Sequence, residues 1–152
     1  MSLSLLRADL RQAANPVYAK ALQRYFKTGP GEYGEGDVFL GIRVPALRRI
    51  ASTHKDLPLE SLGELLGSSI HEERLAALEV LVMQYGKREK ERERIFQFYL
   101  KNTRGINNWD LVDLSAPSLV GEHLRGKEKS VLFRLAASKN IWERRIAILA
   151  TF

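Results

Sequence analysis

The stretch SIHEERLAALEVLVMQYG, residues 69–86, decides the fold of this chain. Its apolar side chains recur at intervals of three and four residues: Leu75, Leu78, Val82 and Tyr85. That spacing places them on one face of a helix that ends at Gly86. Ser69 followed by Glu72 is typical of a capping box, in which each side chain binds the other residue's backbone amide. The stretch therefore predicts an amphipathic helix with a defined beginning and end.

Start signals of further helices recur along the rest of the chain. They are Leu3, Asn15-Pro16, Pro45, Asp56–Pro58, Lys87, Asn107-Asn108, Ser130 and Asn140. No strand-like alternation or hairpin signal accompanies them. Consecutive amphipathic helices, none able to bury its apolar face alone, predict an all-α fold. They favour an α-solenoid of HEAT-like antiparallel helix pairs, the armadillo-type superhelix, and a compact helical bundle is the alternative.

Two segments depart from this pattern. Residues 28–43, TGPGEYGEGDVFLGIR, hold five of the eleven glycines, which predicts a long glycine-rich loop. The loop lacks the Gly-Lys-Ser/Thr ending of a P-loop, so a nucleoside triphosphate site is not expected. The helix that begins at Asn140 reaches Phe152 without a stop signal, and its apolar residues need cover. We therefore expect residues 1–152 to form a single HEAT-like domain, truncated at its C-terminus, that is the N-terminal part of a longer solenoid.

Composition narrows the classes of function. The 152 residues contain 24 Lys and Arg against 18 Asp and Glu, a net charge of +6, which favours an acidic partner such as nucleic acid. The absence of cysteine excludes disulfides, cysteine-ligated zinc, iron–sulfur clusters and a thiol nucleophile. The three histidines lack metal-site spacing, so no metal is expected. No apolar run approaches the roughly 20 residues of a membrane span and no signal peptide is evident, which favours a cytoplasmic protein without membrane contact.

The segment NNWDLVDLSAP, residues 107–117, carries the first candidate chemistry. On a helix, Trp109 and Asp113 are four positions apart and share a face. A carboxylate is rarely placed on an apolar stripe without a partner, so Asp113 is either a functional carboxylate or half of a structural ion pair with an arginine. Asp110 lies in the first turn, where negative charge suits the helix dipole, and we interpret it as structural.

The second segment with candidate functional residues is NIWERRIAI, residues 140–148. Trp142 and Arg145 are three positions apart on one helix face, where the ring can order a guanidinium that binds phosphate. The alternative is a surface cation–π pair, and spacing does not separate the two. We expect Glu143 to partner Asn140 at the helix N-cap.

These side chains together favour a nucleic-acid ligand: they are two tryptophans, a carboxylate and an arginine on neighbouring helices. Aromatic rings contact sugars and bases, an arginine holds the backbone, and a carboxylate stabilises positive charge that develops on a sugar. The basic residues in 87–94 alternate with glutamates and indicate a solvated helix start. Those in 125–139 have fewer acidic neighbours and adjoin Trp142, so they are the better phosphate-facing candidates.

Three strings together resemble the AlkD-type DNA alkylation repair family. They are YFKTGPGEYGEGDVFLGIRVPALR (residues 25–48), NNWDLVDLSAP (residues 107–117) and NIWERRIAIL (residues 140–149). The resemblance implies a DNA glycosylase built from HEAT-like repeats that hydrolyses the N-glycosidic bond of cationic N3- and N7-alkylated purines. It implies double-stranded DNA containing alkylated purines as the partner, no cofactor or metal, and a base that is not extruded into a pocket. We expect a monomer, associated with the nucleoid when it acts on DNA.

The resemblance also implies roles for residues where the motifs match. Asp113 matches the catalytic carboxylate, Trp109 matches an aromatic residue that packs on the lesion-bearing deoxyribose, and Arg145 matches the arginine that contacts the backbone near the lesion. The candidate DNA-binding residues are Trp142, which supports the arginine helix, and Tyr25, Arg43, Arg48 and Lys139.

An alkylated purine is already cationic and leaves without a protonating acid, so one carboxylate is sufficient in the implied mechanism. Asp113 is expected to stabilise the oxocarbenium-like sugar and to position the attacking water. The family continues with further repeats beyond the arginine motif, so we expect weak activity from this 152-residue form. The alternative, of a different class, is a HEAT-type module that binds nucleic acid or protein without catalysis.

Overall fold

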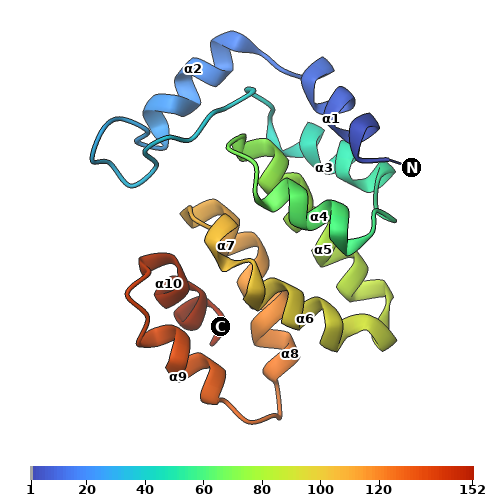
Figure 1. Ribbon diagram of the computed structural model, residues 1–152, viewed down its shortest axis with the longest axis vertical. Coiled ribbons are helices and arrows are strands. Elements are labelled where there is room, and N and C mark those ends of the chain that lie inside the picture. The colour runs from blue at the N-terminus through green and yellow to red at the C-terminus, as the bar shows by residue number, and fades with distance from the viewer. Residues whose placement is uncertain (1) are drawn as a thin grey trace. The chain divides into compact units, whose positions relative to one another are not determined.

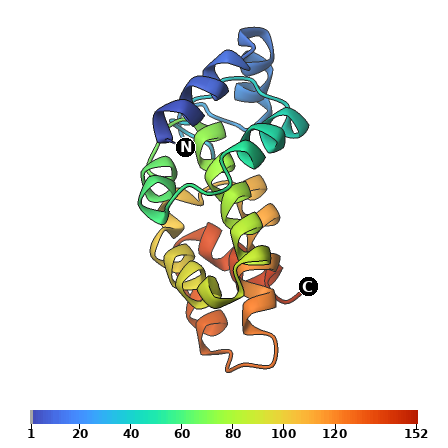
Figure 2. The same ribbon diagram turned by 90° about the vertical axis from the view of Figure 1, so that its right-hand side faces the viewer.

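The computed structural model describes residues 2–152, and over these residues the fold is all-α. Figure 1 and Figure 2 show coiled ribbons without arrows along this part of the chain. The helices are α1 (Leu3–Gln12), α2 (Pro16–Tyr25), α3 (Val44–Thr53), α4 (Leu59–Leu66), α5 (His71–Lys87), α6 (Arg92–Lys101), α7 (Trp109–Ala116), α8 (Glu122–Leu124), α9 (Ser130–Ala136) and α10 (Ile141–Leu149). The predicted all-α class is confirmed, and successive helices joined by short turns are consistent with an α-solenoid.

The chain divides into two compact units, Met1–Val80 and Leu81–Phe152, and the boundary falls inside α5. Each unit has its own apolar core of side chains that are fully buried. In the first unit these include Leu6, Leu10, Leu47, Leu62 and Leu65. In the second they include Ile95, Leu111, Val112, Leu119 and Ile146. Burial of each such side chain contributes about 1.5–3 kcal/mol to stability.

Local capping chemistry places the helix starts of the first unit. The Asn15 side chain accepts hydrogen bonds from the amides of Val17 and Tyr18 at 3.0 and 3.1 Å, which begins α2. Proline in the first turn of α3 leaves no amide unsatisfied, as predicted for Pro45. The helix α4 ends at Gly67, its C-cap residue.

The capping box predicted for Ser69 and Glu72 is wrong. The Glu72 side chain is buried, and its carboxylate accepts hydrogen bonds from three consecutive amides of the glycine-rich loop: Leu40 (2.8 Å), Gly41 (2.8 Å) and Ile42 (3.3 Å). The carboxylate therefore satisfies backbone donors far away in the sequence in place of an amide at its own helix start. This fixes the end of loop 28–43 to the first turn of α5.

A second buried cluster fixes the same loop. Asp37 accepts hydrogen bonds from His71 Nδ1 at 2.8 Å and from Arg74 Nη2 at 2.5 Å. The Phe39 ring stacks on the His71 ring with centroids 4.5 Å apart and on the Phe26 ring at 5.1 Å. The predicted glycine-rich loop 28–43 is thus anchored at its base by ion pairs and aromatic packing.

The Asp37 cluster makes the stability of the protein sensitive to acid. Burial favours the protonated carboxyl, but the hydrogen bond from His71 and the charge of Arg74 outweigh it, so the pKa of Asp37 lies below its ordinary value. The stabilisation is therefore complete above the pKa of the unfolded chain and is lost as pH falls through the lower pKa of the folded chain. Urea titrations at about pH 6 and about pH 3 should show a larger loss of unfolding free energy for the wild type than for Asp37→Asn. Equal losses in the two proteins would contradict this assignment.

Gly41 is required where the loop passes α2. Its φ of 85° lies in the left-handed region, and a Cβ there would collide with the Asn15 carbonyl oxygen and with the Ala19 backbone. We expect Gly41→Ala to lower the free energy of unfolding by about 2 kcal/mol or more. Gly36, at φ 84° with no atom within 4 Å of an added Cβ, is the matched control. A Gly36→Ala loss as large as that of Gly41→Ala, measured by urea titration, would show that the collision is unimportant.

In the second unit the helical path continues through Pro117. A π-helical turn (Pro117–Gly121) joins α7 to α8, and Pro117 lies at the junction where the α-helical hydrogen-bond pattern changes. The helix α10 packs against both α7 and α9. The backbone of α10 approaches so closely that a Cβ on Gly121 would meet the Ala150 carbonyl oxygen at 2.5 Å. This packing places the two helices that carry the candidate motifs side by side.

Candidate active site

The start of α7 fixes the first motif. Asn108 is fully buried, and its side chain accepts a hydrogen bond from the Trp109 amide at 2.8 Å. The Asp110 carboxylate accepts from the Leu111 amide at 2.9 Å, in line with the structural role predicted for it. Leu111 and Val112 turn into the core, whereas Trp109 and Asp113 are half-buried. The helix therefore presents Trp109 and Asp113, four positions apart, at the edge of the core.

Asp113 and Arg145 form a two-pronged ion pair between α7 and α10. Arg145 Nε donates to Asp113 Oδ1 at 2.7 Å, and Nη2 donates to Oδ2 at 2.8 Å. The exposed fractions of the two side chains are 36% for Asp113 and 41% for Arg145. The hydrogen bonds to Asp113 raise the pKa of Arg145 above its ordinary value. The sequence left open whether Asp113 pairs with an arginine, and the structure contains that pair in a position that solvent reaches.

The geometry leaves both side chains with capacity for further partners. A carboxylate has about four lone-pair sites, and Arg145 occupies one on each oxygen. A guanidinium has five N–H donors, of which two bind Asp113. The pair therefore offers an oriented negative charge on one side and unused cationic donors on the other, within a single solvent-accessible site.

The start of α10 is positioned by a different network from the one predicted. The Asn140 side chain accepts from the Trp142 amide at 2.9 Å, as expected for the N-cap. The expected partnership of Glu143 with Asn140 is wrong, because Ser138 Oγ already accepts from the Asn140 amide at 3.0 Å. Glu143 instead accepts from Thr103 Oγ1 at 2.8 Å and from Ser138 Oγ at 2.6 Å. The carboxylate thus ties the first turn of α10 to the 103–105 turn that leads into α7.

Sequence reasoning missed Thr103 and Ser138 as supports of this site. A serine two positions before an N-cap asparagine is a local signal for Ser138, whereas Thr103 is 40 positions from Glu143 and gives none. Two other predicted residues of this segment, Lys139 and Trp142, differ in their exposure to solvent. Lys139 is exposed and Trp142 is half-buried. The Arg144 guanidinium donates to the Ser138 carbonyl oxygen at 2.8 Å and lies apart from the ion pair.

Three predicted DNA-binding residues belong to the unit Met1–Val80. Tyr25 lies at the end of α2 and is 64% exposed. The guanidinium of Arg43, at the start of α3, lies 4.5 Å from the centroid of the Tyr18 ring. Arg48 donates to Glu79 at 2.9 Å, and its side chain is 58% exposed. Both arginines therefore have an intramolecular partner and still reach solvent.

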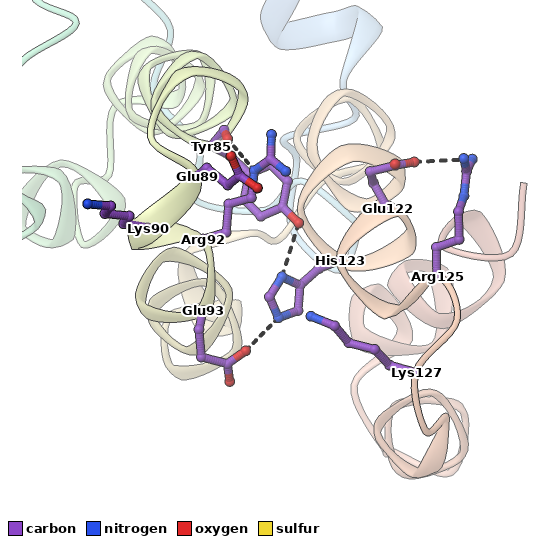
Figure 3. Close-up of a pocket in the computed structure, with 9 residues that line it drawn as sticks. All are labelled: Tyr85, Glu89, Lys90, Arg92, Glu93, Glu122, His123, Arg125 and Lys127. Atoms are coloured by element: carbon purple, nitrogen blue, oxygen red, sulfur yellow. Dashed lines mark hydrogen bonds and ion pairs between the residues drawn. The ribbon is translucent and has the colours of Figure 1, made fainter.

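A polar cavity of about 360 Å³ lies beside α6 and α8, apart from the ion pair (Figure 3). At its wall the buried His123 links Tyr85, whose hydroxyl is 3.0 Å from Nδ1, to Glu93, whose carboxylate is 2.7 Å from Nε2. The His123 ring also stacks on Phe96 with centroids 4.2 Å apart. Burial raises the pKa of Tyr85, which disfavours a tyrosinate nucleophile. We interpret this cluster as a structural link between α5, α6 and α8.

The residues described, 2–152, contain no group of three or more His, Asp or Glu side chains that could hold a metal ion. In the same part of the chain, no helix is long and apolar enough to span a membrane.

Comparison with known proteins adds one finding. A family model described as DNA alkylation repair enzyme matches residues 6–152. No curated protein matches the chain in sequence. Because the family match covers almost the whole length, including both candidate motifs and the glycine-rich loop, the chain belongs to the DNA alkylation repair enzyme family.

Proposed function

We propose that this protein is a DNA glycosylase that hydrolyses the N-glycosidic bond of cationic N3- and N7-alkylated purines in double-stranded DNA. Membership of the DNA alkylation repair enzyme family supports DNA as the substrate and repair as the role. The observation that carries the proposal is the carboxylate of Asp113, which Arg145 orients and which remains accessible to solvent.

The charge of the substrate explains how one carboxylate suffices. An N3- or N7-alkylated purine already carries positive charge, so it leaves as a neutral base without a proton from the enzyme. The positive charge that remains develops on the deoxyribose in an oxocarbenium-like transition state. A carboxylate roughly 4 Å from such a charge near a protein surface attracts it by about 4 kcal/mol, and in our proposal Asp113 supplies that charge and positions the attacking water.

Trp109 and Arg145 complete the proposed site. Trp109 lies one helical turn before Asp113 on α7, where its ring can pack against the sugar whose bond is cleaved. The N–H donors of Arg145 that do not bind Asp113 are suited to a phosphate next to the lesion. Trp142 lies three positions before Arg145 on α10, and in our proposal its ring orders that guanidinium.

The products of the reaction test this proposal. Duplex DNA that carries a single 7-methylguanine is incubated with excess protein, and both the free base and the DNA strand are analysed by mass. We expect free 7-methylguanine and an abasic site in equal amounts, and no base release from the unmethylated duplex. A strand whose guanine stays attached after losing its methyl group would refute glycosidic cleavage. DNA that is bound but unchanged would favour the non-catalytic binding module.

A further inference from the structure

The exposed face of α2 carries positively charged side chains that are not part of the candidate active site. Between Asp9 and Glu32, the segment 10–31 has four cationic side chains and no carboxylate; the cations are Arg11, Lys20, Arg24 and Lys27. The helix α2 within this segment (Pro16–Tyr25) contains no buried residue. Because none of its residues is buried, α2 presents most of its surface to solvent. The charged side chains on that surface are all positive.

Lys20 and Arg24 lie one turn apart on this face. Together with Val17 and Ala21 they line a shallow depression of about 240 Å³. Val17 is 82% exposed, although its side chain is apolar. Within residues 2–152 neither Lys20 nor Arg24 pairs with a carboxylate, whereas Arg7, Arg48 and Arg74 of the same unit do.

The opposite face of α2 is fixed to the rest of its unit. The Asn15 amide donates to the Leu40 carbonyl oxygen at 2.9 Å, and Gly41 lies directly against Ala19. At the other end, Gln23 Nε2 donates to Thr28 Oγ1 at 3.1 Å. The loop that these contacts hold is itself anchored by Glu72 and Asp37. The cationic face is therefore borne on a helix whose orientation within its unit is set.

We propose that the face formed by Val17, Lys20, Ala21 and Arg24 binds the phosphodiester backbone of duplex DNA. The helical rise places the Cα atoms of Lys20 and Arg24 about 6 Å apart along the axis, close to two nucleotide steps of one strand at roughly 3.4 Å each. The short side chains of Val17 and Ala21 lie in the same row, which allows the backbone to approach closely. Contacts to phosphate carry no sequence information, so the proposed contact is independent of sequence.

This inference rests on the proposed function, because it takes DNA as the ligand. The test compares the full chain with the double variant Lys20→Ala/Arg24→Ala in binding to an unmodified DNA duplex over a range of salt concentrations. Loss of two phosphate contacts should reduce the slope of log affinity against log salt by about 2 and weaken binding about tenfold near 0.1 M salt. Alanine favours helix, so both exposed substitutions keep α2 intact, which circular dichroism checks.

The matched control removes the same charge elsewhere. Lys87 and Lys90 are exposed in the second unit, and neither pairs with a carboxylate within residues 2–152. We expect Lys87→Ala/Lys90→Ala to change affinity less than about twofold, because these side chains make no phosphate contact. The exchange Lys20→Arg/Arg24→Lys should retain the wild-type slope.

Three results would overturn the inference. They are an unchanged slope and affinity in Lys20→Ala/Arg24→Ala, an equal loss in the control variant, and a wild type that does not bind duplex DNA. Release of 7-methylguanine by the wild type at saturating protein is measured separately. A wild type that binds DNA but releases no base would refute the proposed glycosylase, while the salt comparison would still decide whether α2 binds the backbone.

Discussion

Asp113→Asn is expected to lower the single-turnover rate of 7-methylguanine release by about 100- to 1000-fold, equivalent to about 3–4 kcal/mol of transition-state stabilisation. Asparagine keeps the shape of the side chain and removes the negative charge that, in the proposed mechanism, stabilises the developing sugar cation. The measurement uses saturating protein, so that a change in DNA affinity does not affect the rate. Stability should change little, because an ion pair whose partners are 36% and 41% exposed contributes at most about 1 kcal/mol.

Asp110→Asn is the matched control for this prediction. Asp110 lies on the same helix, and its carboxylate accepts a hydrogen bond from the Leu111 amide at 2.9 Å, a role that an asparagine side chain can also fill. Its rate of base release should stay within about twofold of the wild type. If Asp110→Asn is as slow as Asp113→Asn, or if Asp113→Asn is as fast as the wild type, the assignment of Asp113 as the reacting carboxylate is wrong.

Glu72→Ala should have the largest effect on stability. The substitution leaves the amides of Leu40, Gly41 and Ile42 without the acceptor that they share in the folded protein. Each buried amide left without a partner costs about 1–3 kcal/mol, so we expect a loss of about 3–5 kcal/mol in the free energy of unfolding. Urea titration followed by circular dichroism measures this loss.

A surface carboxylate provides the comparison for Glu72. The Glu64 side chain is 60% exposed and pairs with Arg7 at 2.9 Å. Glu64→Ala should lower the free energy of unfolding by less than about 1 kcal/mol, since exposed ion pairs contribute little. Glu72→Gln, which keeps one acceptor oxygen, should fall between the two alanine variants. A Glu72→Ala protein as stable as Glu64→Ala would mean that the loop does not depend on this carboxylate.

The helix starts were predictable because the chemistry that sets them is local. The Asn15, Asn108 and Asn140 side chains each accept hydrogen bonds from amides one to three positions further along the chain. Such contacts depend only on neighbouring residues, so the residue types carry the information. The same holds for the left-handed or closely packed glycines of loop 28–43, whose clustering indicates a break between helices.

The two carboxylates whose partners were predicted wrongly show where local reasoning fails. Glu72 and Glu143 each lie three positions after a residue that suggests an N-terminal capping arrangement. In the folded chain, Glu72 binds amides about 30 positions earlier and Glu143 binds a hydroxyl 40 positions earlier. A buried carboxylate that reaches several distant donors gains more hydrogen bonds than one local amide supplies, and nothing in the local spacing indicates which donors the fold brings close.

In the candidate site, too, the local geometry could be predicted from the sequence and the distant contacts could not. The helices over Trp109–Ala116 and Ile141–Leu149 could be predicted, and with them the spacing of four positions from Trp109 to Asp113 and of three from Trp142 to Arg145, because that geometry depends on one helix alone. The contact between Asp113 and Arg145, 32 positions apart, depends on how α7 and α10 pack. The cationic face of α2 has a signal in the sequence, because no carboxylate occurs between Asp9 and Glu32.

The central claim is that Asp113 and Arg145 act as one reacting centre, and a double-mutant cycle in single-turnover base release tests it most directly. Arg145→Ala is measured in the wild type and in Asp113→Asn, at saturating protein and with 7-methylguanine in a defined duplex. If Arg145 acts by orienting the carboxylate, its removal slows the wild type but has little further effect once Asp113 is replaced. Losses that multiply in the double variant, or a wild-type rate in Asp113→Asn, would contradict the account.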